Sequence, residues 1–205
     1  MHIYQNPFSK EYWKEAVADF RELRTLVFSS LMIAACVALS YIPAIPISDG
    51  VRVTWGFLAR ALCGLVGGPI NALVFGFAED TISFLINPQG AYFPGYALTT
   101  MLGTMIYALF LYRARVTVLR VFLAKLCTNI LNVFLGSVWS AVLYSKGYLY
   151  YMTSSAVKNA IMLPVQTVML ILLFTALIPI LARTKMVPKE MNGHLFFRNR
   201  KKSDT

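Results

Sequence analysis

Asn87-Pro-Gln-Gly-Ala-Tyr-Phe-Pro-Gly95 interrupts a long apolar run and decides how the rest of the chain is divided. Its prolines fix φ and lack an N–H donor, and its glycines permit backbone angles that end a helix. Irregular backbone inside an apolar region is tolerated only where it is buried in protein or lines a cavity. We therefore expect Tyr92, Phe93 and Tyr96 to offer flat faces to a flat ligand. The alternative is an ordinary interfacial turn that carries aromatic side chains.

The composition is that of an integral membrane protein. Of the 205 residues, 58% are hydrophobic and 14% are charged, and the mean hydropathy is +0.61, whereas a soluble domain is about one quarter charged. The net charge of +10 gathers in two tails and one short loop, which favours topology control over nucleic-acid binding. The 3 cysteines are isolated in apolar runs and the 2 histidines lie in the tails. The sequence therefore predicts neither a metal site nor a catalytic site.

Uncharged runs predict an all-α protein with six transmembrane helices in a single bundle. The run over 81–112 is too long for one span of ~20 residues, so we divide it at the Asn87–Gly95 break. The glycines and proline of Gly67-Gly-Pro69 divide the preceding run in the same way. The predicted spans lie within 25–48 and over about 55–67, 69–86, 96–112, 117–144 and 154–182.

Both chain ends are predicted to be cytoplasmic. Trp13, Val17 and Phe20 recur at helical spacing among charged residues, which predicts a short interfacial helix before the first span. With six spans, both tails share one side with the loop that carries Arg113 and Arg115, so the positive-inside rule places that side in the cytoplasm. The predicted segments are a cytoplasmic or interfacial segment over 1–22, a membrane substrate-binding domain over 23–183 and a basic tail over 184–205.

Ionisable residues inside a membrane are candidates for function. Asp80 lies seven residues before Asn87, ~10 Å below the outer end of its span, and we expect it to bind a heterocycle with two parallel N–H groups. Its neighbour Glu79 faces another side, where an ion pair with Arg60 between two helices is the alternative to a ligand role.

Further polar candidates for ligand binding lie nearer the outer ends of the predicted spans. Arg52 in the first outer loop and Lys158 in the first turn or two of the last helix suit an anionic group, although Lys158 and Lys125 could instead snorkel to headgroups. For Asn129, interhelical hydrogen bonding is the alternative. The candidate substrate-binding residues are Arg52, Trp55, Phe57, Asp80, Tyr92, Phe93, Tyr96, Asn129, Lys158 and Gln166.

Small residues recur every four positions on the first span, at Ser30, Ala34 and Ala38. This register allows another helix to approach closely. No nucleotide-binding, nucleophile-elbow or metalloprotease motif is present, so the sequence does not predict an enzyme.

The chain resembles the folate-family S components of energy-coupling factor (ECF) transporters, the membrane substrate-binding subunits of a vitamin-uptake class. The resemblance covers about residues 22–182. The residues that carry it are Arg52-Val-Thr-Trp-Gly-Phe57, Gly67-Gly-Pro69 with Gly76 and Asp80, Gly90-Ala-Tyr-Phe-Pro-Gly-Tyr96 with Leu98, and Lys158-Asn159 with Pro164 and Gln166.

The resemblance implies a multi-pass plasma-membrane protein that captures folate from outside in an outward-facing pocket. It also implies that the first span docks through Ala34 and Ala38 onto a transmembrane coupling subunit, which works with two cytoplasmic ATPases. The chain itself would carry no cofactor, because ATP is used by the partners. The alternatives are an S component for another vitamin or pterin-like compound, or a membrane scaffold without a ligand.

The expected binding mode follows the order of the polar residues. The pterin edge is predicted at Asp80, the rings against the aromatic side chains, and the glutamate tail at Arg52 or Lys158. Which of Glu79 and Asp80 reaches the ligand stays open.

Overall fold

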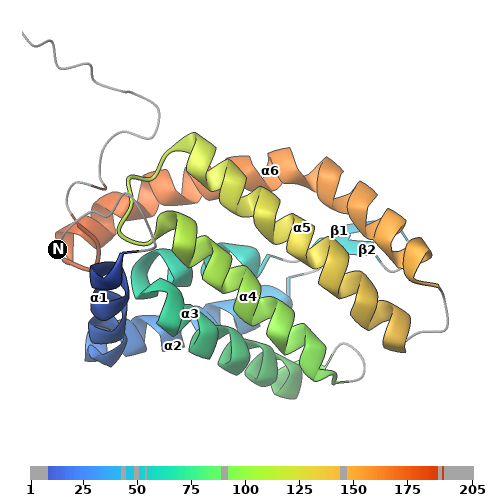
Figure 1. Cartoon of the computed structure of the whole chain (residues 1–205), viewed down its shortest axis with the longest axis horizontal. Helices are drawn as coiled ribbons and strands as arrows, with labels where there is room; N and C mark the ends of the chain where they lie inside the picture. Colours follow the sequence, from blue (N-terminus) through green and yellow to red (C-terminus); the bar gives the residue numbers. More distant parts are fainter. Residues whose placement is uncertain are drawn as a thin grey trace, which may run out of the picture.

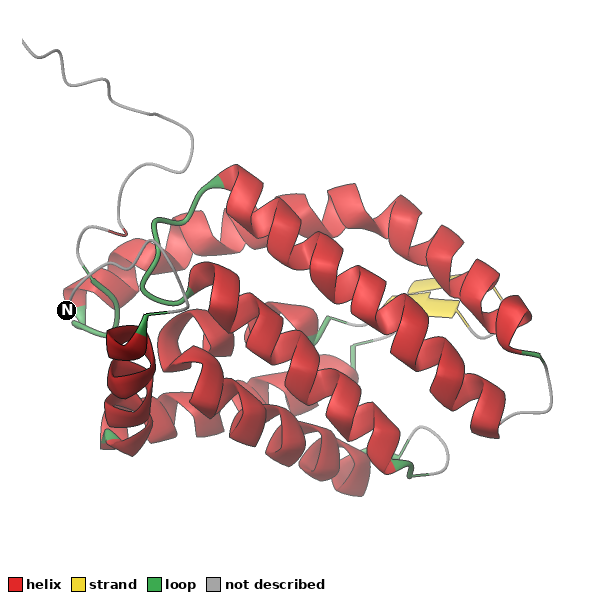
Figure 2. Ribbon diagram, viewed as in Figure 1, coloured by secondary structure: helices red, strands yellow, loops and turns green. Residues whose placement is uncertain are grey.

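The computed structural model describes residues 9–42, 45–48, 51–53, 55–88, 92–143, 147–188 and 191, with the backbone alone for 45–48 and 51–53. Over these residues the chain forms six α-helices and one antiparallel hairpin (Figure 1, Figure 2). Five helices, α2 to α6, are long and apolar enough to cross a membrane. The helices are α1 (Lys10–Arg21), α2 (Leu23–Ser40), α3 (Phe57–Ile86), α4 (Pro94–Leu111), α5 (Val118–Leu143) and α6 (Tyr148–Arg183), and the strands are β1 (Ile45–Ser48) and β2 (Val51–Val53).

Helix α1 lies across one end of the long helices (Figure 1). Ser9 caps it by accepting a hydrogen bond of 3.2 Å from the Tyr12 amide, which satisfies one of the free N–H groups of the first turn. Tyr12 and its neighbours on one face are buried against protein, while Trp13 and Val17 stay 36% and 39% exposed. A helix therefore forms where the sequence predicted one, and its position at a membrane interface stays a prediction.

Helix α3 is broken where the sequence predicted a division. Gly68 has a non-helical backbone with φ 74°, a conformation that glycine adopts without a Cβ penalty. Pro69 follows and cannot donate to the preceding turn. The helix thus consists of two helical halves, 57–67 and 69–86.

Glycines let α3 and α4 approach to backbone contact. A Cβ on Gly64 would lie 2.9 Å from the Ala108 amide nitrogen, and a Cβ on Gly76 would lie 2.6 Å from the Met101 Cα. These separations leave no room for a side chain, so this contact requires glycine at both positions. Gly64 is therefore a residue of the contact between α3 and α4, in addition to the glycines at the break.

The segment between α2 and α3, which the sequence placed over 47–54 as a connection between two spans, holds a hairpin. β1 pairs with β2 in antiparallel register, with Ile45 opposite Val53 and Pro46 opposite Arg52. Alternating β-branched residues favour strands, and Asp49-Gly50 is a frequent hairpin dipeptide. β2 also contacts α6. The connection between the first two spans therefore contains strands, which the sequence analysis did not predict.

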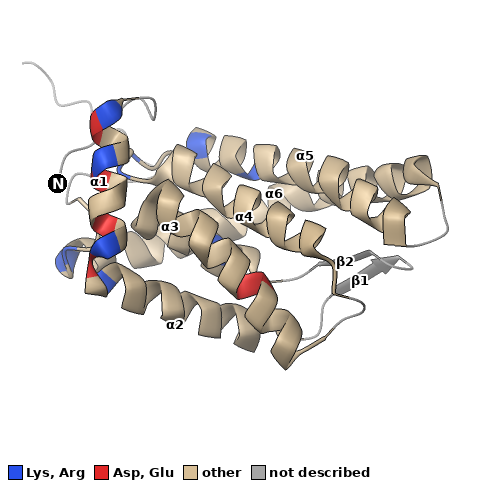
Figure 3. Cartoon of the chain, turned by 60° about the horizontal axis from the view of Figure 1, so that its bottom comes forward, with Lys and Arg blue, Asp and Glu red and all other residues tan. Residues whose placement is uncertain are grey.

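The apolar core and the charges lie in different parts of the molecule. The main core cluster joins α3, α4, α5 and α6, with Leu65, Leu111 and Phe174 at 1% exposure or less. Lys, Arg, Asp and Glu gather at the end where α1 lies (Figure 3). This end is closed by α1, by the connection between α4 and α5, and by Val187 and Met191 after α6.

Candidate functional site

Five buried polar atoms have no hydrogen-bond partner within the described part of the chain. They come from the segment before α3 and from α4, α5 and α6. Buried polar groups in native proteins are nearly always hydrogen-bonded, so a set of unpartnered atoms marks a place where a ligand or water completes the structure. The atoms are Trp55 Nε1, Tyr107 OH, Asn129 Oδ1, Ser137 Oγ and Gln166 Oε1.

A cleft of about 350 Å³ lies between α5 and α6, within the size range of small-molecule sites. Its walls are mainly apolar, and Asn129 and Asn159 are its polar residues. Asn129 Nδ2 donates to the Asn159 carbonyl at 3.3 Å. The interhelical hydrogen bond offered as an alternative for Asn129 is therefore present, but it uses only the amide donor and leaves Oδ1 without a partner.

Lys125 lies one turn before Asn129 on α5 and is 4% exposed. Its Nζ is 4.5 Å from the centroid of the Phe57 ring. The described ion pairs join Arg60 to Glu79 and Arg113 to the acids of α1, so among the described residues Lys125 has no carboxylate partner. A desolvated cation–π contact contributes ~2 kcal/mol, less than the several kcal/mol that burial of a charge costs.

Lys125 was not among the candidate site residues, although an intramembrane lysine is itself a signal. Snorkelling was the alternative for this residue, and its burial within the protein excludes that orientation. The sequence could not show that Phe57, 68 positions earlier, packs over the ammonium group.

An aromatic cluster forms at the start of α4. The Phe93 ring lies 5.5 Å from Trp139 and 6.3 Å from Tyr96. Trp139 Nε1 donates to Thr99 Oγ1 at 2.9 Å, which fixes the indole plane. A Cβ on Gly95 would lie 2.6 Å from Trp139, so glycine at this position lets the rings close over the helix start. Two of the three aromatics predicted from the break meet here, and Trp139 is the member that sequence reasoning missed.

Tyr92 lies apart from this cluster. Its ring packs at 5.0 Å against Phe84 near the end of α3, and the side chain is 41% exposed. Gln89, Gly90 and Ala91 lie outside the described residues.

The two neighbouring acids of α3 have different partners. Arg60 donates twice to Glu79, at 2.9 and 3.1 Å, and Ser83 Oγ donates to the same carboxylate at 3.2 Å. Glu79 therefore forms the ion pair between the halves of α3 that the sequence offered as an alternative to a ligand role. Asp80 faces α4, is half-buried and accepts one hydrogen bond of 3.3 Å from Thr100 Oγ1.

The remaining candidates are distributed along the bundle. Helix α6 begins at Tyr148 rather than near 154, so Lys158 lies in its third turn and not in the first turn or two. The apolar stretch after Gly147 continues the helix in the N-terminal direction, which explains the difference. Gln166 is 8% exposed, deep in α6. Arg52 lies in β2, and its side chain is outside the described part of the structure.

Ser30, Ala34 and Ala38 form an exposed strip on α2. Large apolar side chains flank this strip: Leu23, Val27 and Leu31 are 74%, 60% and 61% exposed. The helix therefore presents an apolar face with a narrow line of small residues, which is a surface that a second helix can approach closely.

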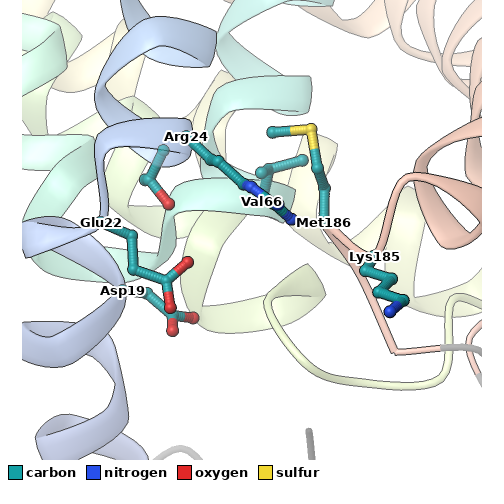
Figure 4. Close-up of a pocket in the computed structure, with 7 residues that line it drawn as sticks. Asp19, Glu22, Arg24, Val66, Lys185 and Met186 are labelled. Carbon is teal, nitrogen blue, oxygen red and sulfur yellow. The ribbon is translucent and has the colours of Figure 1, made fainter.

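A small cavity lies at the end of the molecule that carries the charges. Figure 4 shows Asp19 and Glu22 on one side and Lys185 on the other. With about 10 Å³, the cavity has room for a single water molecule at most. Among the described residues no group of three His, Cys, Asp or Glu side chains is placed to hold a metal ion.

The two curated relatives that the chain resembles carry the same name. No protein-family model matches the chain. It is 34% identical over 121 residues to the folate transporter FolT of Clostridium novyi, which covers 58% of this chain and 70% of the relative. It is 27% identical over 158 residues to FolT of Leuconostoc mesenteroides, covering 70% and 85%.

A solved structure has a similar fold over most of the chain. The crystal structure of FolT bound with folic acid superposes with a TM-score of 0.66 at 25% sequence identity, covering 73% of this chain and 91% of that chain.

Proposed function

The chain belongs to the FolT family of folate transporters, and we propose that it is the membrane-embedded subunit that binds folate for uptake. It is a transport protein and not an enzyme. The comparisons support folate as the ligand, because both relatives are named folate transporters and the solved structure holds folic acid.

The observation that carries the proposal is the set of unpartnered acceptors on α5 and α6. Asn129 Oδ1 and Gln166 Oε1 are buried without donors, and a pterin ring presents several N–H donors on its edge. A hydrogen bond is stronger in the buried, low-dielectric interior. Without a ligand, the two buried acceptors stay unpaired, which costs free energy. The aromatic cluster of Phe93, Tyr96 and Trp139 supplies ring faces against which a flat heterocycle packs.

We further propose that the other predicted residues contribute to this site. Asp80 at the α3–α4 contact is a charged acceptor for pterin donors, and Trp55 and Phe57 line the interior where β2 joins α3. Thr99 and Thr100 are consecutive on α4 and contact Trp139 and Asp80 respectively. The aromatic cluster and Asp80 therefore lie at one level of the bundle, which supports a common pterin site.

We propose that this chain takes the energy for uptake from partner subunits. We propose that it works with a transmembrane coupling subunit and two cytoplasmic ATPases, and that the exposed strip of Ser30, Ala34 and Ala38 contacts the coupling subunit. The strip supports this because its small residues are exposed and flanked by apolar side chains. In this proposal the two ATPase subunits bind and hydrolyse ATP, and this chain does not.

The proposed topology has six crossings, with both termini in the cytoplasm of a plasma-membrane protein. The break at Gly68 supports counting the two halves of α3 as separate crossings. Arg60 and Glu79, on opposite sides of the break, form an ion pair of 2.9 Å, which a straight helix would not allow because it would hold them ~28 Å apart. The charges gathered at the α1 end (Figure 3) support a cytoplasmic location for that end.

Ligand identification tests the proposed function. The protein is purified in detergent, the copurified small molecule is identified by mass spectrometry, and folate is titrated while tryptophan fluorescence is followed. We expect folate to be recovered and to quench the emission, because Trp55 and Trp139 lie at the proposed site. Recovery of a ligand without a pterin, or no response to folate, would overturn the proposal.

A further inference from the structure

We propose that α1 binds the headgroups of anionic phospholipids through Lys10, Lys14 and Arg21, while Trp13 and Val17 lie at the boundary with the acyl chains. This inference goes beyond the proposed function, because it concerns another end of the molecule and another partner. The sequence pattern predicted an interfacial helix. The fold adds which face of that helix meets the lipid and which headgroups the face fits.

The first step of the argument is that α1 has three sides of different chemistry. Tyr12, Ala16 and Asp19 are buried against the bundle. Glu11 and Glu15 follow a second side, because residues four positions apart are neighbours on a helix. The third side combines cations with apolar residues, and all of them are exposed except the partly buried Phe20: Lys10, Trp13, Lys14, Val17, Phe20 and Arg21.

The second step is the charge of this third side. None of its three cations forms an ion pair within the described part of the molecule. The acids of α1 are engaged elsewhere, since Glu15 and Asp19 both bind Arg113, and Glu11 is the only fully exposed acid of this helix. The side of α1 that faces away from the bundle therefore presents a net positive charge. Anionic lipids of the cytoplasmic leaflet are complementary to such a surface.

The third step is the level at which α1 lies. Only Glu22 separates α1 from α2, and its amide donates to the Asp19 carbonyl at 3.2 Å, so α1 stays next to the first turn of α2. That turn already exposes apolar side chains, with Leu23 at 74%. Leu119 is 65% exposed at the start of α5, which lies at the same end of the molecule (Figure 1). The apolar surface of the spans thus reaches α1, which lies across their ends, in the plane where amphipathic helices bind.

The fourth step is that α1 is held in one orientation. The Tyr12 hydroxyl donates to the Ala108 carbonyl at 3.4 Å, and Arg113 donates to Asp19. These contacts fix the buried side and with it the direction of the exposed side. The Trp13 ring packs edge-on against Tyr12, with centroids 5.9 Å apart. An indole has an apolar body and one N–H donor, which favours the membrane interface.

The test measures which lipids contact Trp13. The full-length protein has 3 tryptophans, and Trp55→Phe with Trp139→Phe leaves Trp13 as the reporter in phosphatidylcholine liposomes. Brominated phosphatidylglycerol or brominated phosphatidylcholine is included at equal mole fraction, and quenching of the emission is compared. One Lys or Arg near an anionic surface strengthens binding by about fivefold. We therefore expect the quenching to give a preference for phosphatidylglycerol of about fivefold or more.

Two combined variants with equal loss of charge locate the binding. The first removes the cations of α1 and should reduce the preference to less than about twofold. The second removes three exposed cations at the same end of the molecule but outside α1, and it should keep the preference. The first variant is Lys10→Gln, Lys14→Gln and Arg21→Gln, and the second is Arg115→Gln, Arg183→Gln and Lys185→Gln.

A control reporter and a second measurement complete the test. Val168→Trp, in a chain without the native tryptophans, lies on α6 with 56% exposure and should be quenched equally by the two lipids. The protein with all its tryptophans is also melted in detergent with either lipid added. Phosphatidylglycerol should raise the melting temperature more than phosphatidylcholine does. This difference should be lost in the first variant and kept in the second.

Three results would overturn the inference. Equal quenching of Trp13 by the two brominated lipids would show that α1 does not select anionic headgroups. The absence of quenching by either lipid would place Trp13 away from the membrane, in water or on a partner protein. An equal loss of preference in both combined variants would assign the effect to the charge of that whole end. None of these measurements uses folate, so a protein that fails to bind folate would contradict the proposed function alone.

Discussion

The guanidinium group of Arg113 donates two hydrogen bonds, of 2.9 and 2.8 Å, to the carboxylate of Asp19 across 94 residues of sequence. Glu15 accepts from the same guanidinium group, and the Tyr112 hydroxyl donates to Asp19 at 2.6 Å. Burial, and then Asp19, raise the pKa of Tyr112 well above its ordinary value, so the phenol stays protonated as a donor. Arg113 holds a left-handed backbone with φ 47°, which is uncommon outside glycine and is maintained here by these contacts.

Asp19→Asn should destabilise the protein through this network. The substitution removes the charge that accepts two hydrogen bonds from Arg113 and leaves only the partly exposed Glu15 to compensate the guanidinium group, so the free energy of unfolding should fall by ~2–3 kcal/mol. Thermal unfolding in detergent measures the change as a lower melting temperature. Glu11→Gln, at an exposed position of the same helix, is the matched control and should leave the melting temperature unchanged. Equal melting temperatures for the two variants would show that the network contributes nothing to stability.

Glu79→Gln and Asp80→Asn should separate stability from binding. Glu79 is 2% exposed and held by Arg60, so Glu79→Gln should lower the free energy of unfolding by ~3 kcal/mol. Asp80→Asn should cost roughly 1 kcal/mol or less, since one hydrogen bond is altered. Folate and 6-methylpterin should each bind to Asp80→Asn about tenfold more weakly. Unchanged affinity in Asp80→Asn would exclude Asp80 from the pterin site.

Gly76→Ala should destabilise the contact between α3 and α4. Its Cβ would lie 2.6 Å from the Met101 Cα, which forces two backbones apart and costs ~1–3 kcal/mol. Gly136→Ala is the control, because a Cβ there has nothing within 4 Å and alanine favours a helix by ~1 kcal/mol. The two melting temperatures should therefore move in opposite directions. A stabilised Gly76→Ala would show that α4 can move away at no cost.

Ala38→Trp should block uptake while folate binding is retained. The side chain prevents the close approach that small residues permit, and Ala38 is exposed, away from the proposed ligand site. Uptake of labelled folate by cells and binding by the purified protein are measured in parallel. Ala176→Trp, at an exposed position of α6, should affect neither. A parallel loss of binding and uptake in Ala38→Trp would make the strip an internal packing surface.

Labelling of intact cells tests the topology. Gln89→Cys, in a background without the native thiols, should react with an impermeant thiol reagent, because the connection before α4 is proposed to face outside. A cysteine at Glu11 should react only after lysis, since α1 is proposed to lie in the cytoplasm. The reverse pattern would invert the orientation.

The sequence predicted the features that depend on local chemistry. Gly68-Pro69 was expected to divide a helix and does so, and the pairing of Arg60 with Glu79 was anticipated as one of two readings. Contacts between distant segments were not predicted. The packing of Phe57 over Lys125 depends on how β2 leads into α3, and periodicity along one helix carries no information about a ring on another.

The hairpin and the aromatic cluster show the same limit. The stretch before Val53 was placed only as a connection between spans, without strands, because two prolines and a high apolar content concealed its alternation of β-branched residues. Trp139 was overlooked because a tryptophan near a helix end is typical of the membrane interface, and only the fold brings it to Phe93. The six-span count, the site residues as a set and the partner subunits stay predictions.

The bond between Arg113 and Asp19 sets an order of events during synthesis. At ~5–20 residues per second, the 94 residues between them take roughly 5–20 s to translate, and for that time α1 has no partner on the later part of the chain. Arg113 reaches the α1 side only if α4 is inserted in the native direction, since the opposite direction would leave it across the bilayer. Docking of α1 thus requires that the helices made before Arg113 have crossed in the native direction, and a chain inserted in the wrong direction would keep α1 undocked.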